Sequence, residues 1–201
     1  WVAAWQDVSV QEMIVVAAFM CIAAPRERPA DAKQAADTAH RQFADSGSEF
    51  LAVIRLWRAY RQMHEELSQS QLRKWCERNF LSYLRMREWR ELHRQLLITA
   101  RELQWPLPEW PDIEARLEAA AQDTKAAARH YQQIHRAVLA GLPTQIGHKN
   151  DKGLYDGPRQ RRFAIFPASP LAGQLPNWCL VGNLLDTQKV WGLMAAKIEP
   201  D

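Results

Sequence analysis

The sequence predicts an α+β protein in which a helical bundle precedes a small five-stranded β-barrel. Glycine is scarce, with 8 in 201 residues, and long stretches rich in Ala, Leu and Arg favour helix before residue 141. From residue 142, Gly, Asn and Asp separate short runs of β-branched and aromatic residues, a pattern typical of strands. A hydrophobic content of 47% is sufficient for a buried core. We therefore expect two domains, residues 1–141 and residues 142–201.

Apolar periodicity and capping patterns predict the first helices. One helix is expected over Ser9–Ala24, where the next residue is proline, and an Ala-rich helix over Asp31–Phe43. Ser46–Glu49 has the S-x-x-E pattern of a capping box, so a third helix should begin there. A second box at Ser68–Gln71 predicts the start of a helix that includes Trp75–Leu103.

A longer helix is expected after the proline-rich segment WPLPEWP at residues 105–111. Its prolines interrupt helical periodicity, but Pro111 suits a first helical turn, which leaves its backbone N–H groups unpaired. Apolar residues continue at helical spacing from Ile113 to Val138, and Gly141 suits a C-terminal cap. We expect one helix from Pro111 to Gly141.

Five short strand candidates follow. Closure of such strands into a barrel removes exposed edges, so a small barrel of the OB-fold type is the economical arrangement for about sixty residues. The candidates are Thr144–His148, Leu154–Gly157, Arg162–Pro167, Asn177–Leu185 and Val190–Ile198.

Positive charge is concentrated in one helical segment. The chain has a formal net charge of +3, and residues 55–94 contain ten Lys or Arg and five Glu. Such a surface attracts polyanions through counterion release. A solvated helix face with ion pairs such as Arg73–Glu77 and Arg87–Glu91 explains the same residues. From charge alone, the solvated face is the preferred interpretation.

The composition gives no indication of a membrane, an oxidising compartment or a metal. The apolar run Met13–Ala24 has 12 residues, fewer than the roughly 20 that cross a bilayer, and is interpreted as a buried helix. Cys21, Cys76 and Cys179 form no C-x-x-C pair, which favours a reducing cytoplasm with the cysteines in the core. The six histidines lack metal-ligand spacing, so no metal site is expected.

Two pairs of segments carry a family resemblance. The first pair is ERPADAKQAADTAHRQFADSGSEFL (residues 27–51) and WCERNFLSYLRMREWRELHRQL (residues 75–96). The second is GLPTQIGHKNDKGLYDGPRQRRFAIFPAS (residues 141–169) and PNWCLVGNLLDTQKVWGLMAAKIEP (residues 176–200). In this order they resemble the helicase-associated region that follows the motor of DEAH-box RNA helicases, most closely the bacterial HrpA type. The resemblance extends from Met13 to Pro200.

In that family a helical ratchet domain and an OB-fold lie against two RecA-like motor domains, and a winged helix precedes the ratchet. The resemblance implies that this chain is the accessory C-terminal part of a cytoplasmic, ATP-dependent RNA helicase and is a monomer. Its expected partners are single-stranded RNA and the motor domains and winged helix of the same polypeptide. The chain has no G-x-x-x-x-G-K-[ST] phosphate loop and no Asp-Glu-x-His motif. We therefore expect no catalytic residues and no cofactor here, with ATP and Mg²⁺ bound by the motor domains.

Basic residues are the expected RNA contacts. Those of the barrel lie near turns, where they could hold a phosphate backbone, although ordinary solubilising surface explains a short basic loop equally well. Arginines of the ratchet-like part are expected to face the RNA channel or to dock on the motor. The barrel candidates are Lys149, Lys152, Arg159, Arg161, Arg162 and Lys189, and the helical candidates are Arg55, Arg58, Arg85 and Arg90.

Most tryptophans are expected in the core rather than under RNA bases. Phe163 and Phe166 are three apart on a strand and should point to opposite faces, so the exposed one is the better stacking candidate. The tryptophans expected in cores or at domain interfaces are Trp57, Trp75, Trp89, Trp178 and Trp191.

The alternative function is a protein-interaction module that docks the motor or an activating partner without touching RNA. Steep loss of affinity with salt would indicate phosphate contacts, whereas an apolar docking surface responds weakly. A free-standing RNA-binding adaptor is a third possibility.

One segment departs from the family. Trp105–Gln133 is longer than expected between a ratchet and an OB-fold. We expect a lineage-specific elaboration of the surface there.

Overall fold

The computed structural model describes residues 9–200, and its contacts divide them into two compact units, which we describe separately. The barrel unit comprises residues 9–13, 45–50 and 105–200, and the helical unit comprises residues 14–44 and 51–104. Compact units defined by contacts need not coincide with folding domains, so the expected boundary between residues 141 and 142 stays a prediction. Within residues 9–200, every helix is too short or too polar to cross a membrane.

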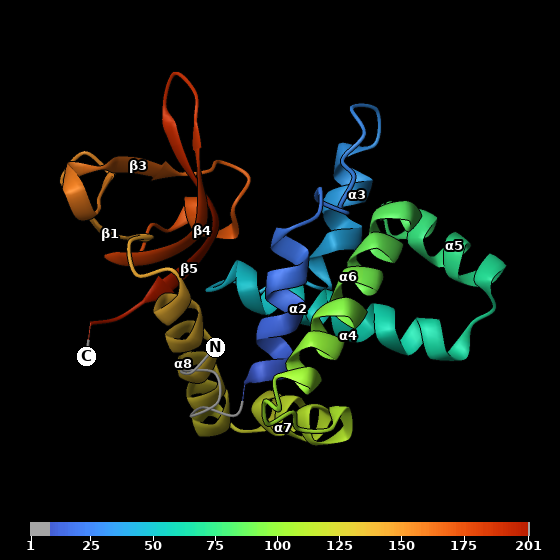
Figure 1. Cartoon of the computed structure of the whole chain (residues 1–201). Coiled ribbons are helices and arrows are strands. Elements are labelled where there is room, and N and C mark those ends of the chain that lie inside the picture. The colour runs from blue at the N-terminus through green and yellow to red at the C-terminus, as the bar shows by residue number, and fades with distance from the viewer. Residues whose placement is uncertain (1–8, 201) are drawn as a thin grey trace. The chain divides into compact units, whose positions relative to one another are not determined.

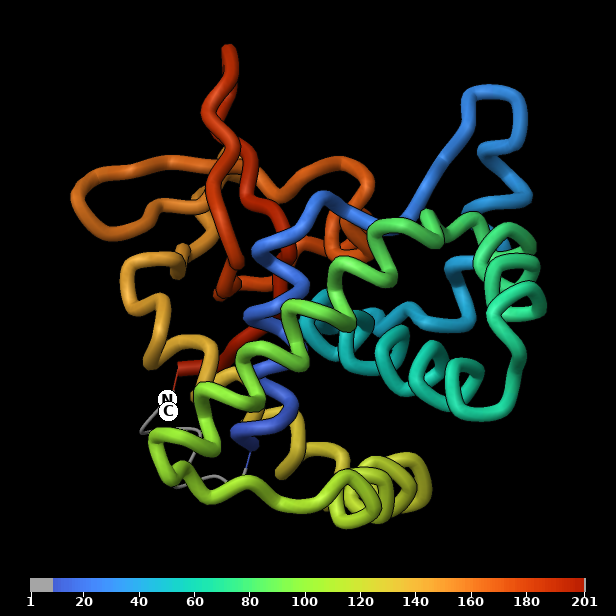
Figure 2. Tube along the Cα trace, turned by 45° about the vertical axis from the view of Figure 1, so that its right-hand side comes forward, coloured from blue at the N-terminus to red at the C-terminus, as the bar shows by residue number. Residues whose placement is uncertain are grey.

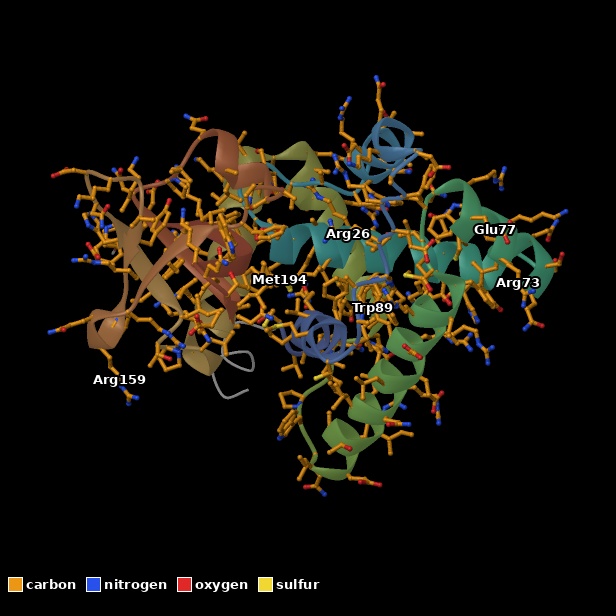
Figure 3. All side chains as sticks on the ribbon, turned by 90° about the horizontal axis from the view of Figure 1, so that it is seen from above. Arg26, Arg73, Glu77, Trp89, Arg159 and Met194 are labelled. Carbon is orange, nitrogen blue, oxygen red and sulfur yellow. The ribbon has the colours of Figure 1, made fainter. Side chains whose placement is uncertain are left out.

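Five helices provide most of the helical unit, and tryptophans fill its core. Trp89 is 0% exposed, its ring centroid lies 5.0 Å from that of Phe19 and 4.8 Å from that of Trp57, and its indole N–H donates to the carbonyl of Val15 at 3.0 Å. Figure 3 shows Trp89 among densely packed side chains. Trp57 and Trp89 are thus core residues as predicted, while Trp75 is half-buried. The helices are α2 (Val10–Met20), α3 (Lys33–Arg41), α4 (Glu49–Glu66), α5 (Gln69–Arg78) and α6 (Tyr83–Glu102).

The capping box at the start of α5 is confirmed, but the helix it opens is shorter than predicted. Ser68 accepts from the N–H of Gln71, whose side chain accepts from the N–H of Ser68. The expected single helix through Leu103 is wrong, because the chain turns between α5 and α6 at Phe80, which has a φ of 52°. Ser82 then caps α6. Figure 2 lets the reader follow this turn along the trace.

Hydrogen bonds to residues distant in sequence stabilise the turn between α5 and α6. The N–H of Glu27 donates to the carbonyl of Phe80 at 2.8 Å, and the N–H of Ser82 donates to the carbonyl of Pro25 at 2.8 Å. These partners replace the helical bonds that a continuous helix would have provided. The interruption is therefore set by tertiary structure.

The helix expected from Pro111 to Gly141 is also two helices, α7 (Trp110–Gln122) and α8 (Thr124–Gly141). Asp123 lies between them in an extended conformation and accepts from the N–H groups of Lys125 and Ala126, at 3.2 and 3.1 Å, which makes it the N-cap of α8. Gly141 is the last residue of α8 rather than its cap. The bend lets α7 and α8 pack against each other as a helical hairpin.

The segment Trp105–Gln133 is part of the packed barrel unit and not a surface elaboration. Ile113 of α7 is 0% exposed. Glu12 is also 0% exposed, and its carboxylate lies 3.5 Å from Arg116 of α7 and 3.4 Å from His130 of α8. A buried carboxylate requires such partners, because desolvation penalises the charge. The α7–α8 hairpin thus encloses a polar cluster.

The five strands form a closed barrel, as predicted (Figure 1), and their order around it is β1-β2-β3-β5-β4. β3 and β5 are parallel and the other pairs are antiparallel. The β4–β5 hairpin extends beyond the barrel body (Figures 1 and 2). The strands are β1 (Ile146–Lys149), β2 (Tyr155–Asp156), β3 (Arg162–Ile165), β4 (Trp178–Asp186) and β5 (Val190–Ile198).

Phe163 occupies the interior of the barrel, where two glycines make room for its ring. A Cβ on Gly147 would lie 2.8 Å from the Phe163 ring, and a Cβ on Gly192 would lie 2.9 Å from it. The cluster around Phe163 also contains Tyr155 and Val181 but neither Trp178 nor Trp191. The prediction that these two tryptophans lie in the barrel core is therefore wrong.

Strand β5 changes its inward face at Met194, which has a φ of 54° and is labelled in Figure 3. Before this residue Val190 packs against the core and a side chain at Gly192 would enter it, so even-numbered residues face inward. After it, Ala195 is a core residue. Because side chains alternate along a strand, the residues beside Val190 and Gly192 point outward.

Residues 45–50 belong to the barrel unit although the strands begin at Ile146. Ser48 forms a β-bridge with Ala196, and the carbonyl of Gly47 accepts from the N–H of Lys197 at 2.8 Å and from the hydroxyl of Tyr131 at 2.9 Å. Asp45 folds the segment by accepting from the N–H groups of residues 47 and 48 at 2.9 Å each. The segment is thus fixed to both β5 and α8.

The predicted capping box at Ser46–Glu49 is wrong, because Glu49 is used in a distant contact. Helix α4 begins at Glu49, not directly after Ser46. The Oε2 atom of Glu49 accepts from the N–H of Ala195 in β5 and from the hydroxyl of Ser169, both at 2.7 Å. A charged acceptor for a buried strand N–H is a stronger interaction than a local cap.

Two of the three cysteines match the sequence interpretation. Cys76 and Cys179 are buried, and burial raises the pKa of each thiol to about 12. Cys21 is exposed, so its expected place in the core is wrong. It follows Met20, the last residue of α2, where the helix ends four residues earlier than predicted.

Candidate nucleic-acid interface

The barrel topology divides the six predicted RNA-contacting cations of the barrel into two groups. β1, β2 and β3 run alternately up and down, so the β1–β2 loop with Lys152 and the β2–β3 loop with Arg159 leave opposite ends of β2. Lys149 ends β1 on the Lys152 side, while Arg161 and Arg162 lie on the Arg159 side. The sequence predicted these five residues near one turn region, apart from Lys189, but of the five the structure brings together only the three arginines.

Lys189 lies at the same end as the arginines. β3 and β5 are parallel with Ala164 opposite Trp191, and Arg162 and Lys189 each precede this pair by two residues. Parallel strands start at the same edge of a sheet. We name Arg159, Arg161, Arg162 and Lys189 the cationic end of the barrel.

The residues of the cationic end are exposed, and one of them is ion-paired. Arg159 has a φ of 58° in the β2–β3 loop and points away from the barrel in Figure 3. Arg162 donates to Asp156 across the β2–β3 ladder at 2.7 Å. Hydrogen bonds from Asn150 and Arg162 lower the pKa of the Asp156 carboxyl, so it is ionised at neutral pH and offsets one charge. Lys149, by contrast, donates to the carbonyl of Leu175 at 3.1 Å.

The four predicted arginines of the helices belong to the helical unit. Arg55 donates to the carbonyl of Ala44 at 2.5 Å, and Arg85 donates to that of Ala24 at 2.7 Å. Arg90 contacts the ring of His64. Arg58 is half-buried on α4. These positions are compatible with a structural use of the side chains.

Ion pairs expected along the basic helices are confirmed in kind by Arg61 and Glu65, which pair at 2.8 Å four residues apart, but the two named pairs do not form. The guanidinium carbons of Arg73 and Arg87 lie 5.1 and 5.9 Å from the ring centroid of Tyr83. Glu91 pairs with Arg94 at 2.6 Å. A cation over an aromatic ring is a favourable alternative to an exposed ion pair.

The outer face of the barrel carries an aromatic pair beside the cationic end, and sequence reasoning found only half of it. Phe166 is 37% exposed and its ring centroid lies 5.8 Å from that of Trp191, with the rings nearly perpendicular. The ammonium of Lys189 lies 4.8 Å from the Trp191 centroid. Phe166 is the exposed phenylalanine that the sequence anticipated. Trp191 was assigned to the core, although its neighbours Val190 and Gly192 could have shown that it alternates outward.

The barrel unit contains a buried Ser–His contact. Its distance is that of a catalytic nucleophile and its base, but the serine is not accessible to a substrate. Ser48 Oγ lies 2.5 Å from His135 Nε2, and His135 Nδ1 lies 2.6 Å from the carbonyl of Tyr131. Ser48 is 0% exposed, so no substrate reaches it. Burial lowers the pKa of His135 to about 4, and the neutral imidazole holds the 45–50 segment to α8.

A groove of about 740 Å³ lies in the barrel unit between α8 and the strands β1, β4 and β5. Trp178 lines it, and the ring of Trp178 also lies 4.6 Å from that of His148.

No group of three or more His, Cys, Asp and Glu within residues 9–200 is arranged to hold a metal ion.

Comparison with known proteins identifies the region. No protein-family model matches the chain. A protein described as ATP-dependent RNA helicase HrpA homolog, from Haemophilus influenzae, is 40% identical over 193 residues, which is 96% of this chain. ATP-dependent RNA helicase HrpA of Escherichia coli strain K12 is 37% identical over the same number of residues. The chain is homologous to a segment of the HrpA helicases.

The resemblance that the motifs indicated is thereby confirmed. The chain spans 14% of the length of these HrpA relatives, so most of each relative has no counterpart here. The matched 96% of this chain includes both its helices and most of its five-stranded barrel. The activity in the relatives' names belongs to proteins about seven times longer than this chain.

Proposed function

We propose that this chain is an accessory region of an ATP-dependent RNA helicase, in which it binds single-stranded RNA and guides translocation. The cationic end of the barrel carries this proposal, because four exposed cations surround the start of the parallel pair β3–β5. Cations along a groove or edge hold a nucleic-acid backbone, and the OB-type barrel is a common scaffold for this. The homology to HrpA supports RNA as the polyanion.

The hydrolytic chemistry is proposed to reside elsewhere. The sequence contains no phosphate-binding loop, so ATP and Mg²⁺ would bind to motor domains of the same cytoplasmic polypeptide. The chain itself would be monomeric, would pack on those motor domains and the winged helix, and would hydrolyse no ATP. An ATPase assay with and without RNA checks the last point, and a turnover above background would contradict it.

The alternative function is a docking module for the motor or an activating partner. Exposed apolar side chains on α6 favour it: Leu84 is 62% exposed and Ile98 is 40% exposed. Arg55 and Arg85 are already bonded to backbone carbonyls of the helical unit, which leaves them less available to RNA. In this alternative the helical unit binds protein and the cationic end of the barrel is solubilising surface.

Fluorescence anisotropy of a labelled single-stranded RNA tests the proposal. The chain is titrated between low and moderate salt and compared with the triple variant Arg159→Ala, Arg161→Ala and Arg162→Ala. Each phosphate contact on a single strand contributes about 0.7 to the slope of log affinity against log salt, so the variant should lower the slope by about two. Arg162→Ala also releases Asp156, which adds repulsion and weakens binding further.

A matched control separates a located site from general attraction. The triple variant Arg41→Ala, Arg101→Ala and Arg129→Ala removes the same charge from exposed positions outside the barrel. We expect it to bind nearly as tightly as the unchanged chain. Equal weakening by both triple variants, or no binding at low salt, would refute RNA binding at the cationic end and favour the docking module.

A further inference from the structure

The outer face of the barrel next to the cationic end has an apolar patch formed by Phe166, Leu185 and Trp191. Leu185 lies opposite Trp191 in the β4–β5 ladder and is 44% exposed. Phe166 follows β3, its N–H donates to the carbonyl of Gly192 at 3.1 Å, and its ring lies against that of Trp191. Three different segments therefore place two aromatic rings and one aliphatic side chain together.

The alternation of β5 keeps this patch on the outside. Val190 and Gly192 face the core, where a Cβ on Gly192 would lie 2.7 Å from Val181, so Trp191 has to point outward. Its ring is only partly covered, by Phe166 at one side and Lys189 over its face. A large aromatic pair exposed on a strand face is a feature of binding surfaces.

The charges around the patch match a polyanion. The ammonium of Lys189 lies 4.8 Å from the Trp191 centroid, and Arg162 begins the neighbouring strand at the same end. Two carboxylates lie at this end of the strands: Asp156 is paired with Arg162, and Asp186 ends β4 opposite Val190. Together with Arg159 and Arg161 the cations outnumber the carboxylates, so the field at this end favours phosphates.

We propose that Phe166 and Trp191 form a base-stacking site for single-stranded RNA, with Lys189 as the cation that pairs with the adjoining phosphate. This inference rests on the proposed function and names the aromatic rings on which the bases of the bound RNA stack. In the free protein Lys189 lies over the face of Trp191. When RNA binds, a base occupies that face or the exposed face of Phe166, and the ammonium shifts to the phosphate.

Stacking distinguishes this site from simple charge attraction and from an apolar protein contact. Every nucleobase has a flat π-face, so two aromatic rings bind bases with little sequence preference. Bases in a duplex are already stacked and do not offer their faces, so the site should discriminate against duplex RNA. Leu185 shares the patch but has no ring to stack on a base, which makes it the natural control.

The test compares two ligands, an oligouridylate of eight nucleotides and a ribose-phosphate strand of the same length without bases. The variants are Phe166→Ala, Phe166→Tyr and Leu185→Ala, and the thermal unfolding of each is measured to verify that it is folded. Anisotropy at fixed low salt should show that Phe166→Ala weakens oligouridylate binding about 5- to 150-fold and leaves the abasic strand unaffected. Phe166→Tyr should bind like the unchanged chain, and Leu185→Ala should lower affinity less than twofold.

The outcomes separate this inference from the function on which it rests. If the unchanged chain binds neither strand, the proposed RNA binding itself fails. If it binds both equally and Phe166→Ala changes nothing, RNA is held by charge alone and the stacking site is refuted. If Phe166→Ala and Leu185→Ala weaken both ligands to the same extent, the patch acts through its general packing, and stacking is again refuted.

Discussion

Replacement of Glu49 should destabilise the barrel unit more than replacement of an exposed glutamate does. The Oε2 atom of Glu49 accepts from the N–H of Ala195 and the hydroxyl of Ser169, both at 2.7 Å. Ala195 is fully buried, so Glu49→Ala leaves its N–H without a partner. A hydrogen bond to a charged group contributes about 1.5–3 kcal/mol, and Glu49 is half-buried, so we expect a loss of about 3 kcal/mol from the free energy of unfolding.

The assay is urea unfolding at pH 7, followed by far-ultraviolet circular dichroism. Glu49→Gln retains an acceptor oxygen without the charge and should lose about 1 kcal/mol. A double-mutant cycle with Ser169→Ala should give a coupling energy of about 1 kcal/mol, because the two side chains share a bond. The control is Glu88→Ala, which removes an exposed carboxylate from α6. If Glu49→Ala and Glu88→Ala both cost less than about 0.5 kcal/mol, the bonds of Glu49 do not stabilise the fold.

Three further predictions concern stability. Burial lowers the pKa of His93 and of His135 to about 4, below the ordinary value near 6.5, so the unfolded chain takes up protons first as the pH falls. The free energy of unfolding should therefore decrease from pH 6.5 to pH 4, by up to about 3 kcal/mol for each histidine, and the variants His93→Gln and His135→Gln should each reduce this dependence in urea titrations at several pH values. Gly192→Ala places a Cβ 2.7 Å from Val181 and should cost about 1–3 kcal/mol in the same assay. Ser68→Ala removes the N-cap of α5 and should cost about 1 kcal/mol.

Each of these changes has a matched control. His148→Gln, which changes an exposed histidine, is the control for the two histidine variants. Gly173→Ala adds a Cβ with nothing within 4 Å and should be nearly neutral. Ser70→Ala alters an exposed serine, the second residue of α5, and should cost less than Ser68→Ala at the cap. If a control variant changes stability as much as the variant it is paired with, the physical reason given for that variant is wrong.

Features decided by neighbouring residues could be predicted from the sequence. β5 has the predicted bounds, Val190–Ile198, because its apolar residues are flanked by the polar hairpin DTQK. The cap at Ser68 is formed within three residues of chain. The closed barrel could be predicted because closure of five short strands removes their exposed edges. The bounds of β5 and the cap thus depend on interactions within a few residues, whereas barrel closure, which pairs β1 with β4 and β3 with β5, could be predicted only from the general cost of exposed strand edges.

Features decided by distant residues could not be predicted in this way. The sequence Asn79–Ser82 contains neither Gly nor Pro, yet α5 and α6 separate there because residues 25–27 supply the hydrogen bonds. Glu49 matched a local motif while its partner in β5 is 146 residues away. The positions of the barrel cations were partly predictable, since successive loops of an antiparallel meander lie at opposite ends. Their binding of RNA stays a prediction.

The attachment of residues 45–50 to β5 has a consequence for biosynthesis. Because Ser48 and Glu49 contact Ala196 and Ala195, the barrel unit cannot complete its hydrogen bonds until β5 has left the ribosome. Contacts between residues so far apart in sequence raise the contact order and slow folding. A nascent chain ending before β5 would present residues 45–50 and the open side of β4 without their partners. Glu49 thus has to wait for the synthesis of a partner that lies 146 residues further along the chain.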